Sequence, residues 1–340
     1  MTRKKKAYAR AGVDVDLGNR LKRQIQSLVK KTHGPQALGN IGGFGALFQA
    51  RFPRMREPVL VASIDGVGTK LKIAFAMNKH DTVGADLVNH CVNDIATLGA
   101  RPLFFLDYIG CERLEPRVFQ QLLRGFSRAC RAAGCALLAG ETAQMPGMYQ
   151  RGEYDLAGCI VGVVDRVKII AGRKIKPGDV ILGLASNGLH TNGYSLARTI
   201  LFDKMKLRPT SRLPGSMGGV STELLRVHKN YQPLLGKVPS GMIKGLAHIT
   251  GGGLIDNLPR ILPKNCDAVI ETKSWTIPRI FQILQQNGKI NPREMYQVFN
   301  MGIGMVAVAA EKDADCAMSI LRAKRIGRIE RGTGKTVLSF

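Results

Sequence analysis

The sequence predicts a fold of mixed α and β structure, described as α+β or α/β, in two domains. Short apolar runs with the length of buried strands alternate with amphipathic helical stretches along the chain. A chain of 340 residues is long enough for two domains of ordinary size, each with its own core. A basic, loop-like stretch at residues 171–179 interrupts the alternation. We therefore expect an N-terminal domain with a mixed sheet at residues 1–170 and a C-terminal α/β domain at residues 171–340.

The elements of the first half follow from hydrophobic period and from residues that start or stop helices. Proline is favoured in the first turn of a helix and glycine just after its end, which sets the bounds of a helix from Pro116 to Gly134. Its apolar residues recur at helical spacing and form one face. In order, the patterns predict a strand at 59–64, a helix at 83–99, a strand at 103–109, this helix, and strands at 135–139 and 156–164.

The second half alternates in the same way. Apolar runs of strand length occur near its beginning and near its end, with helical periodicity between them. The patterns predict a strand at 180–185, helices near 194–205, 221–235 and 275–286, a strand at 305–310 and a helix at 314–324.

Bulk composition indicates a soluble globular protein, with 45% hydrophobic and 22% charged residues. No apolar stretch approaches the roughly 20 residues of a membrane span. Acidic residues follow the basic start almost at once, at Asp14 and Asp16, which disfavours an acid-poor transit peptide and leads us to expect a cytoplasmic protein. Seven scattered cysteines without a Cys-x-x-Cys pair argue against a disulfide framework and against a zinc site.

The formal net charge of +25 raises the alternative of a nucleic-acid-binding protein, because polycations release counterions from phosphate backbones. The basic residues are enriched near both ends but recur along most predicted helices, and no aromatic residues interleave with them in a stacking pattern. We expect a basic solvated surface without a nucleic-acid partner. Such a surface would attract phosphorylated metabolites.

The segment from Asp65 to Lys70 is the most informative motif, because it follows a predicted strand and combines several groups that suit a nucleotide. A carboxylate can bind a metal ion, glycines let the backbone approach a ligand, and an ammonium group can pair with phosphate. The spacing is not that of a Walker A loop. A Walker-like ending at residues 334–336 lacks the helix that must follow, and we interpret it as a terminal turn. The residues assigned to the nucleotide here are Asp65, Gly66, Gly68, Thr69 and Lys70.

Two further acids of the first half are candidate metal ligands together with Asp65. Asp94 lies in an otherwise apolar helix, where an unpaired charge is unfavourable, and Glu141 follows a strand end. Each acid alone is more often a surface or capping residue. Carboxylates that converge from separate elements suit Mg²⁺ held between protein and nucleotide phosphates, so we predict a magnesium site from Asp65, Asp94 and Glu141.

Two polar loops of the second half are candidates for substrate binding. Residues 186–195 follow a strand and precede a helix, where amides, hydroxyls and an imidazole favour an anion, although such a loop also serves as an N-cap. The glycine run at 250–253 has the form of a phosphate-binding nest, or of a flexible turn. The predicted substrate contacts are Asn187, His190, Asn192, Ser195, Thr250, Gly251, Gly252 and Gly253.

Several segments together resemble one family, phosphoribosylformylglycinamidine cyclo-ligase, also called aminoimidazole ribonucleotide synthetase. The similarity runs in order from about Tyr8 to Val308 and rests on residues 8–14, 65–70, 93–94, 140–149, 190–195 and 250–253. The resemblance implies ATP-driven ring closure of formylglycinamidine ribonucleotide to 5-aminoimidazole ribonucleotide, with Mg²⁺. It also implies a homodimer whose N-terminal sheets pair, and a glycine-rich amino-terminal segment that folds over the nucleotide.

For this reaction the resemblance implies specific roles. Asp65, Asp94 and possibly Glu141 would hold Mg²⁺, with Lys70 beside the transferring phosphoryl group. The nucleotide would contact Gly66, Gly68, Thr69, Glu141 and Thr142. His190 would position or deprotonate the amidine, and Thr250 to Gly253 would hold the ribose phosphate of the substrate.

The sequence departs from the family pattern at Gln144, where an acid is usual, and at Thr191, where a serine is usual. Both residues keep hydrogen-bonding capacity, but Gln144 is not a further metal ligand. Two related enzymes are alternatives. Selenophosphate synthetase would carry a reactive cysteine near its amino-terminal loop, whereas the first cysteine here is Cys91. Thiamine-phosphate kinase would lack the segments 140–149 and 190–195 as written.

Overall fold

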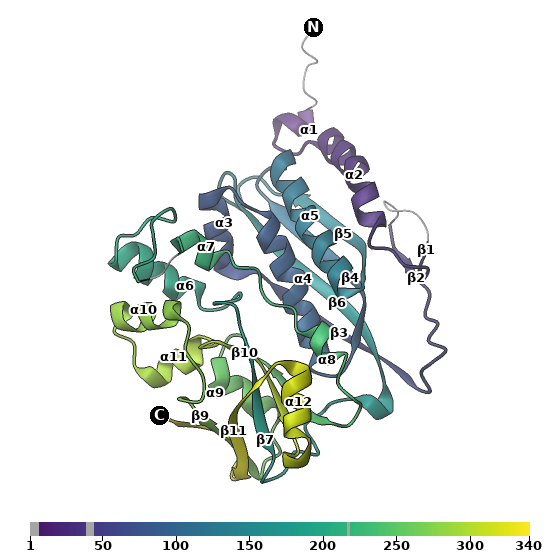
Figure 1. Ribbon diagram of the computed structural model, residues 1–340. Coiled ribbons are helices and arrows are strands. Elements are labelled where there is room, and N and C mark those ends of the chain that lie inside the picture. The colour runs from purple at the N-terminus through teal and green to yellow at the C-terminus, as the bar shows by residue number, and fades with distance from the viewer. Residues whose placement is uncertain (1–6, 39–43, 216–217) are drawn as a thin grey trace.

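The computed structural model of the protein describes residues 7–38, 44–215 and 218–340. The described residues form three β-sheets, the smallest of which pairs β1 (Ala37–Leu38) with β2 (Leu47–Phe48). Figure 1 shows the two larger sheets, each associated with helices. The first sheet has the strand order β3-β6-β4-β5, with β4 and β5 parallel and the other pairs antiparallel, so it is the mixed sheet that was predicted. Its strands are β3 (Pro58–Gly66), β4 (Arg101–Cys111), β5 (Ala136–Gln144) and β6 (Tyr154–Asp165).

Helices α4 (Asp81–Ala96) and α5 (Pro116–Ala133) cover one face of this sheet (Figure 1). The two helices approach closely because Gly84 and Gly125 carry no side chain where they cross. A Cβ atom on Gly125 would lie 2.3 Å from the carbonyl oxygen of Asp81. Helix α2 (Val15–Lys30) packs against α5 and β5.

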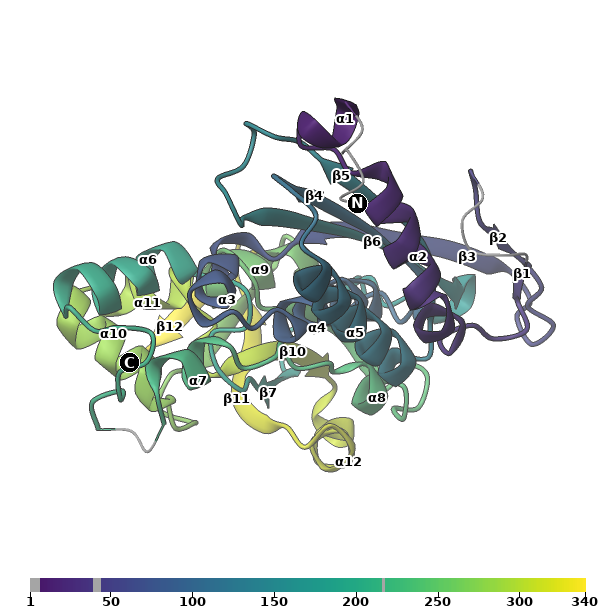
Figure 2. The same cartoon turned by 90° about the horizontal axis from the view of Figure 1, so that it is seen from above.

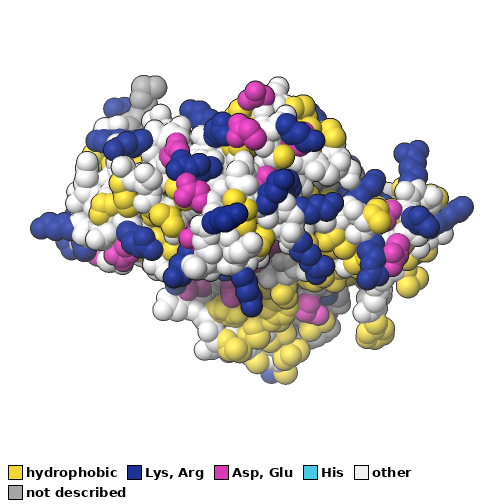
Figure 3. Space-filling view, turned by 90° about the horizontal axis from the view of Figure 1, so that it is seen from below, with side chains coloured by type: hydrophobic (Ala, Val, Ile, Leu, Met, Phe, Trp, Pro, Cys, Tyr) yellow, Lys and Arg dark blue, Asp and Glu magenta, His cyan; other side chains and the backbone are white. Residues whose placement is uncertain are grey.

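The opposite face of the first sheet is apolar and open to solvent in this chain. Because side chains alternate along a strand, Leu60, Ala62 and Ile64 of β3 share this face. Leu60 is 63% exposed and Ile64 is 72% exposed. Seen from below, the molecule shows hydrophobic side chains gathered at its lower edge, while Lys and Arg are spread over the rest of that view (Figure 3).

The second sheet has six strands in the order β12-β9-β11-β7-β10-β8, and all pairs except β12 and β9 are antiparallel. Alternate residues of β7 face two different cores. Val180, Leu182 and Leu184 pack in one cluster with α12, whereas Ile181 belongs to the main core. The strands are β7 (Val180–Ala185), β8 (Ile243–His248), β9 (Cys266–Glu271), β10 (Ile303–Ala309), β11 (Lys324–Arg331) and β12 (Thr336–Ser339).

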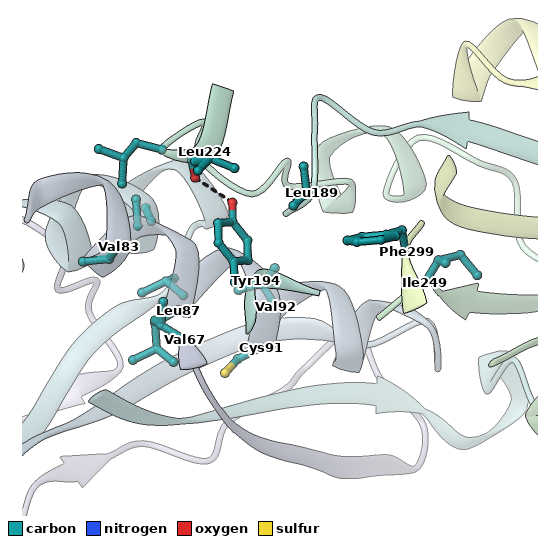
Figure 4. Packing of buried hydrophobic residues seen from close by; sticks show 14 of the residues in the cluster. Val67, Val83, Leu87, Cys91, Val92, Leu189, Tyr194, Leu224, Ile249 and Phe299 are labelled. Atoms are coloured by element: carbon teal, nitrogen blue, oxygen red, sulfur yellow. Dashed lines mark hydrogen bonds between the residues drawn. The ribbon is translucent and has the colours of Figure 1, made fainter. Parts of the chain in front are cut away.

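The main hydrophobic core continues from the first half into the second. Figure 4 shows Val67, Leu87 and Val92 of the first half on one side of Tyr194, whose ring comes from the second half. The Tyr194 hydroxyl donates a hydrogen bond of 2.6 Å to the carbonyl oxygen of Leu224. The two halves therefore share buried apolar contacts.

The helix predicted at 221–235 is wrong in its middle. The structure has α7 (Val220–Leu224) and α8 (Gln232–Leu235), and the intervening residues form no regular element. Side chains of α4 form hydrogen bonds with the backbone of these intervening residues, and these bonds replace the ones that a helix would make.

Other boundaries also differ from the sequence patterns. The helix expected at 275–286 starts only at Arg279, directly after Pro278, whose ring disfavours helical conformation in the residue before it. The helix expected to reach 324 ends at Leu321, and Arg322 takes a left-handed conformation. Strands β1, β2, β8, β9, β11 and β12 were not predicted, and β12 begins at Thr336, the last residue of the turn expected at 334–336. The second half is thus an antiparallel α+β unit with one parallel strand pair.

The remaining helices are short or lie around the second sheet (Figure 2). No helix in the described ranges has the length and apolar character needed to cross a bilayer. Most of the glycine-rich segment 39–45 lies outside the described residues. The helices not yet given are α1 (Ala7–Arg10), α3 (Leu71–Met77), α6 (Tyr194–Arg198), α9 (Gly253–Asn257), α10 (Arg279–Gly288), α11 (Pro292–Val298) and α12 (Ala314–Leu321), and a π-helical stretch (Thr199–Lys204) follows α6.

Candidate active site

Helix α4 carries a polar stripe that faces the second half of the chain. The stripe consists of Asp86, Asn89, His90, Asn93 and Asp94, spaced three or four residues apart and therefore on one side of a helix. The other residues of α4 are mostly apolar and buried. Each of the five polar side chains contacts a residue beyond position 180.

The stripe holds the irregular segment 226–231 in place. The Asn89 amide donates to the His228 carbonyl oxygen at 2.7 Å, and the Asn93 amide donates to the Lys229 carbonyl oxygen at 2.8 Å. The backbone N–H of Tyr231 donates back to Asn93 at 2.9 Å. These bonds satisfy backbone groups that would otherwise need a helix or a strand.

Lys70 lies buried between the two halves, and this position differs from the predicted one at the phosphate. Its side chain is 0% exposed, and its ammonium nitrogen lies 2.8 Å from an Asp86 carboxylate oxygen. The ammonium group also donates to the carbonyl oxygens of His190, at 3.1 Å, and Arg226, at 2.7 Å. Burial lowers the pKa of Lys70, against the attraction of Asp86. With all of its donors engaged, Lys70 is placed to join the halves.

Asp65 and Asp94 converge on His90. The His90 Nε2 atom lies 2.9 Å from Asp65 and 3.9 Å from Asp94, and Ser63 donates to Asp94 at 3.0 Å. Burial by itself would lower the pKa of His90, but the two carboxylates outweigh it and the pKa is raised. Conversely, although burial opposes it, the nearby histidines lower the pKa of both Asp65 and Asp94, so both are ionised at neutral pH. The Asp65 side chain is 43% exposed and open to a ligand.

Glu141 does not join this group, in contrast to the predicted three-acid site. Glu141 of β5 lies in one row across the sheet with Tyr108 of β4, Ala157 of β6 and Gly66 of β3. Three steps of about 4.8 Å separate β5 from β3 by roughly 14 Å. Side chains in one row share a face, so Glu141 points away from the face that carries Asp65. Glu141 and Thr142 line a separate cavity of about 550 Å³ beside α2.

The loop after β7 contacts the first half through the predicted Ser195 and through Thr191, which was not predicted as a site residue. The Thr191 hydroxyl lies 2.8 Å from the His90 Nδ1 atom, and the Ser195 hydroxyl lies 3.0 Å from that of Thr69. The His190 ring is buried against Gly304, where a Cβ atom would lie 2.4 Å from the ring. The predicted residue Asn187 is exposed and donates to the Val227 carbonyl oxygen at 2.7 Å.

The glycine run after β8 forms a turned backbone that only glycine fits. Gly252 and Gly253 have φ angles of 96° and 57°, and a Cβ atom on Gly253 would lie 2.0 Å from the Tyr296 carbonyl oxygen. The Asn257 amide donates to the carbonyl oxygens of Gly251 and Gly253. A Cβ atom on Gly251 would lie 3.4 Å from the Asn192 side chain, so the two substrate loops are adjacent.

Sequence reasoning missed His90, His228, His248 and Asn257 as site residues. The spacing of His90 within the polar stripe of α4 was a usable signal. His248 directly precedes the glycine run and lies 2.8 Å from Asp94. No sequence signal marks His228, because its position depends on the tertiary contacts of segment 226–231.

The buried histidines give a testable dependence of stability on pH. Burial, with the charges of His248, His90 and Lys70, lowers the pKa of His190 and His228 well below the usual value. Their contribution to stability is therefore present above the usual histidine pKa and is lost as pH falls. The raised pKa of His90 acts in the opposite sense, with a contribution that is lost as pH rises through its folded pKa.

We predict that acidification from neutral pH lowers the free energy of unfolding less in His228→Gln than in the unchanged protein. Urea unfolding across a pH series with a chelator present measures this difference. His33→Gln, a half-buried histidine outside the cluster, is the control and should follow the unchanged protein. Parallel curves for His228→Gln and the unchanged protein would contradict the burial of a neutral His228 ring.

The comparisons with known proteins show which family the chain resembles. Residues 50–164 match the family described as AIR synthase related protein, N-terminal domain, and residues 176–338 match the corresponding C-terminal domain. Among curated relatives, phosphoribosylformylglycinamidine cyclo-ligase of Syntrophotalea carbinolica is 52% identical, covering 92% of this chain and 89% of its own length. The enzyme of the same name from Syntrophus aciditrophicus is 48% identical and covers 99% of both chains.

Solved structures show the same fold at low identity. Thiamine-monophosphate kinase from Stenotrophomonas maltophilia aligns with a TM-score of 0.69 at 19% identity, over 96% of each chain. Hydrogenase maturation protein HypE in complex with ATP aligns with a TM-score of 0.67 at 18% identity, over 93% of this chain and 90% of its own. The identity and coverage of the curated relatives, together with both domain matches, show that the chain belongs to the AIR synthase family.

Proposed function

We propose that this protein closes the imidazole ring of 5-aminoimidazole ribonucleotide from formylglycinamidine ribonucleotide, with ATP converted to ADP and phosphate. The formyl amide oxygen is a poor leaving group, so transfer of the γ-phosphoryl group of ATP to it forms an iminophosphate. The amidine nitrogen attacks the activated carbon, loses a proton, and displaces phosphate as the ring closes. The curated relatives of the same name over nearly the full chain support this assignment.

The observation that carries the proposal is the contact between the elements of the first half that hold the nucleotide-binding candidates and the elements of the second half that hold the substrate-binding candidates. The side chains of Thr69 and Ser195 are hydrogen-bonded, as are those of His90 and Thr191. The His248 side chain is hydrogen-bonded to Asp94. Phosphoryl transfer depends on holding donor and acceptor close together in a fixed orientation. A protein of the same fold, HypE, is described in complex with ATP, which supports ATP as the nucleotide here.

A magnesium ion fits Asp65 and Asp94, because both carboxylates are ionised and both lie within 4 Å of the His90 Nε2 atom. The Asp65 side chain is also accessible to solvent. When bound, Mg²⁺ would neutralise charge on the phosphate groups. His90 orients Asp65 through a contact of 2.9 Å, whereas Ser63 and His248 hold Asp94. Glu141 is too distant to share that ion and is proposed, with Thr142, to serve another part of the nucleotide. Gly66 and Gly68 would let the backbone approach it.

The second half supplies the proposed substrate contacts. The turned backbone at 250–253 offers successive N–H groups to the ribose phosphate, and Asn192 lies beside it. Burial keeps the pKa of His190 low, so its ring is neutral at pH 7. We propose that His190 positions or deprotonates the amidine. On this assignment residues 1–170 form the ATP-binding and dimerisation domain, and residues 171–340 form the substrate-binding domain.

The direct test is formation of 5-aminoimidazole ribonucleotide and ADP from formylglycinamidine ribonucleotide, ATP and Mg²⁺. We predict that the unchanged protein catalyses this reaction and that Asp94→Asn lowers kcat by about 100-fold or more, because a phosphate-facing metal ligand is lost. Asp315→Asn, an exposed acid on α12, is the matched control and should keep full activity. Absence of product from the unchanged protein would refute the function, and full activity of Asp94→Asn would remove Asp94 from the metal site.

We further propose that two chains pair through the open face of the first sheet. The exposed side chains of Leu60 and Ile64 form an apolar surface there, and burying such side chains stabilises an interface. The pairing of N-terminal sheets that the family resemblance implies would use this face.

Ile64→Lys places a charge in the proposed interface and should shift the protein from dimer to monomer in analytical ultracentrifugation. Val337→Lys, at an exposed position of β12 in the second sheet, should leave the dimer intact. A dimer that survives both Ile64→Lys and Leu60→Lys would show that another surface holds the chains together.

A further inference from the structure

Four of the six histidines of the protein gather where the two halves meet. His90 comes from α4, His190 from the loop after β7, His228 from the segment 226–231, and His248 from the end of β8. The ring centroids of His190 and His228 are 4.0 Å apart, and those of His228 and His248 are 5.0 Å apart. The proposed reaction uses His190 and leaves His228 without a role.

We infer that His190, His228 and His248 form a binding site for a divalent transition metal ion of the zinc class. One ring nitrogen from each residue can be chosen so that the three atoms lie within 4.8 Å of one another. Neutral imidazole is a preferred ligand of Zn²⁺ and Co²⁺, whereas Mg²⁺ prefers oxygen. The site is therefore distinct in chemistry from the carboxylates proposed for magnesium.

The spacing of His228 and His248 suits a shared ion. Their Nε2 atoms lie 3.0 Å apart. Two nitrogens bound to one tetrahedral zinc at about 2.0–2.1 Å lie roughly 3.4 Å apart, so a small outward shift of the two rings makes room for the ion.

His190 provides a separate indication of a missing ligand. Its side chain is 2% exposed, and neither ring nitrogen has a hydrogen-bond partner among the described residues. A buried polar atom left without a partner costs about 1–3 kcal/mol, which an ion would offset. The rings of His190 and His228 are stacked at 23°, so the His190 ring turns about its Cβ–Cγ bond to direct a nitrogen at the ion.

The outer contacts of His228 and His248 use their Nδ1 atoms, so a metal ion would replace only the hydrogen bond between the two Nε2 atoms. The His248 Nδ1 atom donates to Asp94 at 2.8 Å, and the His228 Nδ1 atom lies 3.2 Å from the Thr191 hydroxyl. A histidine that binds metal through one nitrogen commonly bonds a carboxylate or another polar group through the other. Both Nε2 atoms are thus directed at the proposed ion.

Metal binding here would have two consequences. An ion held by three segments from the second half, next to α4, would stabilise the folded chain. It would also engage the ring of His190, so zinc-class ions would inhibit ring closure. This second consequence rests on the proposed function, whereas binding itself does not.

The test uses the full-length protein, freed of metal with a chelator and titrated with Co²⁺. We expect one ion per chain, with the intense visible absorption of tetrahedral Co²⁺. His228→Gln and His190→Asn should each weaken the affinity by about 10-fold or more. His33→Gln should bind as the unchanged protein does. Thermal unfolding of each metal-free variant checks that it is folded, and the second variant keeps the test decisive if one fails to fold.

Activity with Mg²⁺ separates the two proposals. His228→Gln should resist inhibition by Zn²⁺ that affects the unchanged enzyme. Stoichiometric Co²⁺ binding by a protein without cyclo-ligase activity would refute the proposed function and leave the metal site standing. Absence of Co²⁺ binding, or binding that both variants retain in full, would overturn the metal site. The histidines would then form only a hydrogen-bonded chain from Thr191 to Asp94.

Discussion

The buried ion pair between Lys70 and Asp86 is the interaction on which the arrangement of the two halves depends. Charges are stable away from water only when they are paired and hydrogen-bonded, and removing one partner of a buried pair typically costs about 3–5 kcal/mol. The ammonium group of Lys70 also bonds the carbonyl oxygens of His190 and Arg226. One side chain at the end of the Asp65 loop thereby sets the position of the His190 loop and of the segment 226–231.

Helix α4 extends this constraint along the whole contact between the halves. Its apolar residues face its own sheet and α5, while its polar stripe contacts the second half. A helix buried on nearly every side thereby pairs most of its polar side chains, although Thr82 Oγ1 and Asn89 Oδ1 have no hydrogen-bond partner among the described residues. The same stripe carries His90 and Asp94, which connect Asp65 on one side to Thr191 and His248 on the other. The residues that join the halves and the residues proposed for chemistry therefore form one hydrogen-bonded network.

Local pattern was sufficient to predict the strands β3, β4, β6 and β7 and the helix α5, because each is a long run with a clear period or a proline and glycine boundary. The loops around Asp65, His190 and Gly252 were also identifiable, since their polar residues stand at the ends of strands. Long-range contacts determined the rest. The segment 226–231 is irregular because α4 bonds its backbone. Lys70 can be buried because the Asp86 carboxylate pairs with it. Glu141 lies far from Asp65 because the strand order places β5 and β3 at opposite edges of the sheet, and strand order cannot be read from local sequence patterns.

The central claim is that Lys70 and Asp86 act as a pair across the contact between the halves. A double-mutant cycle tests it, with Lys70→Met, Asp86→Asn and the double variant compared by urea unfolding. Asparagine keeps an acceptor for the backbone N–H of His228, so the cycle isolates the charge. We predict that the double variant is more stable than the sum of the single losses implies, by about 2 kcal/mol or more. Losses that add within about 0.5 kcal/mol would contradict the claim.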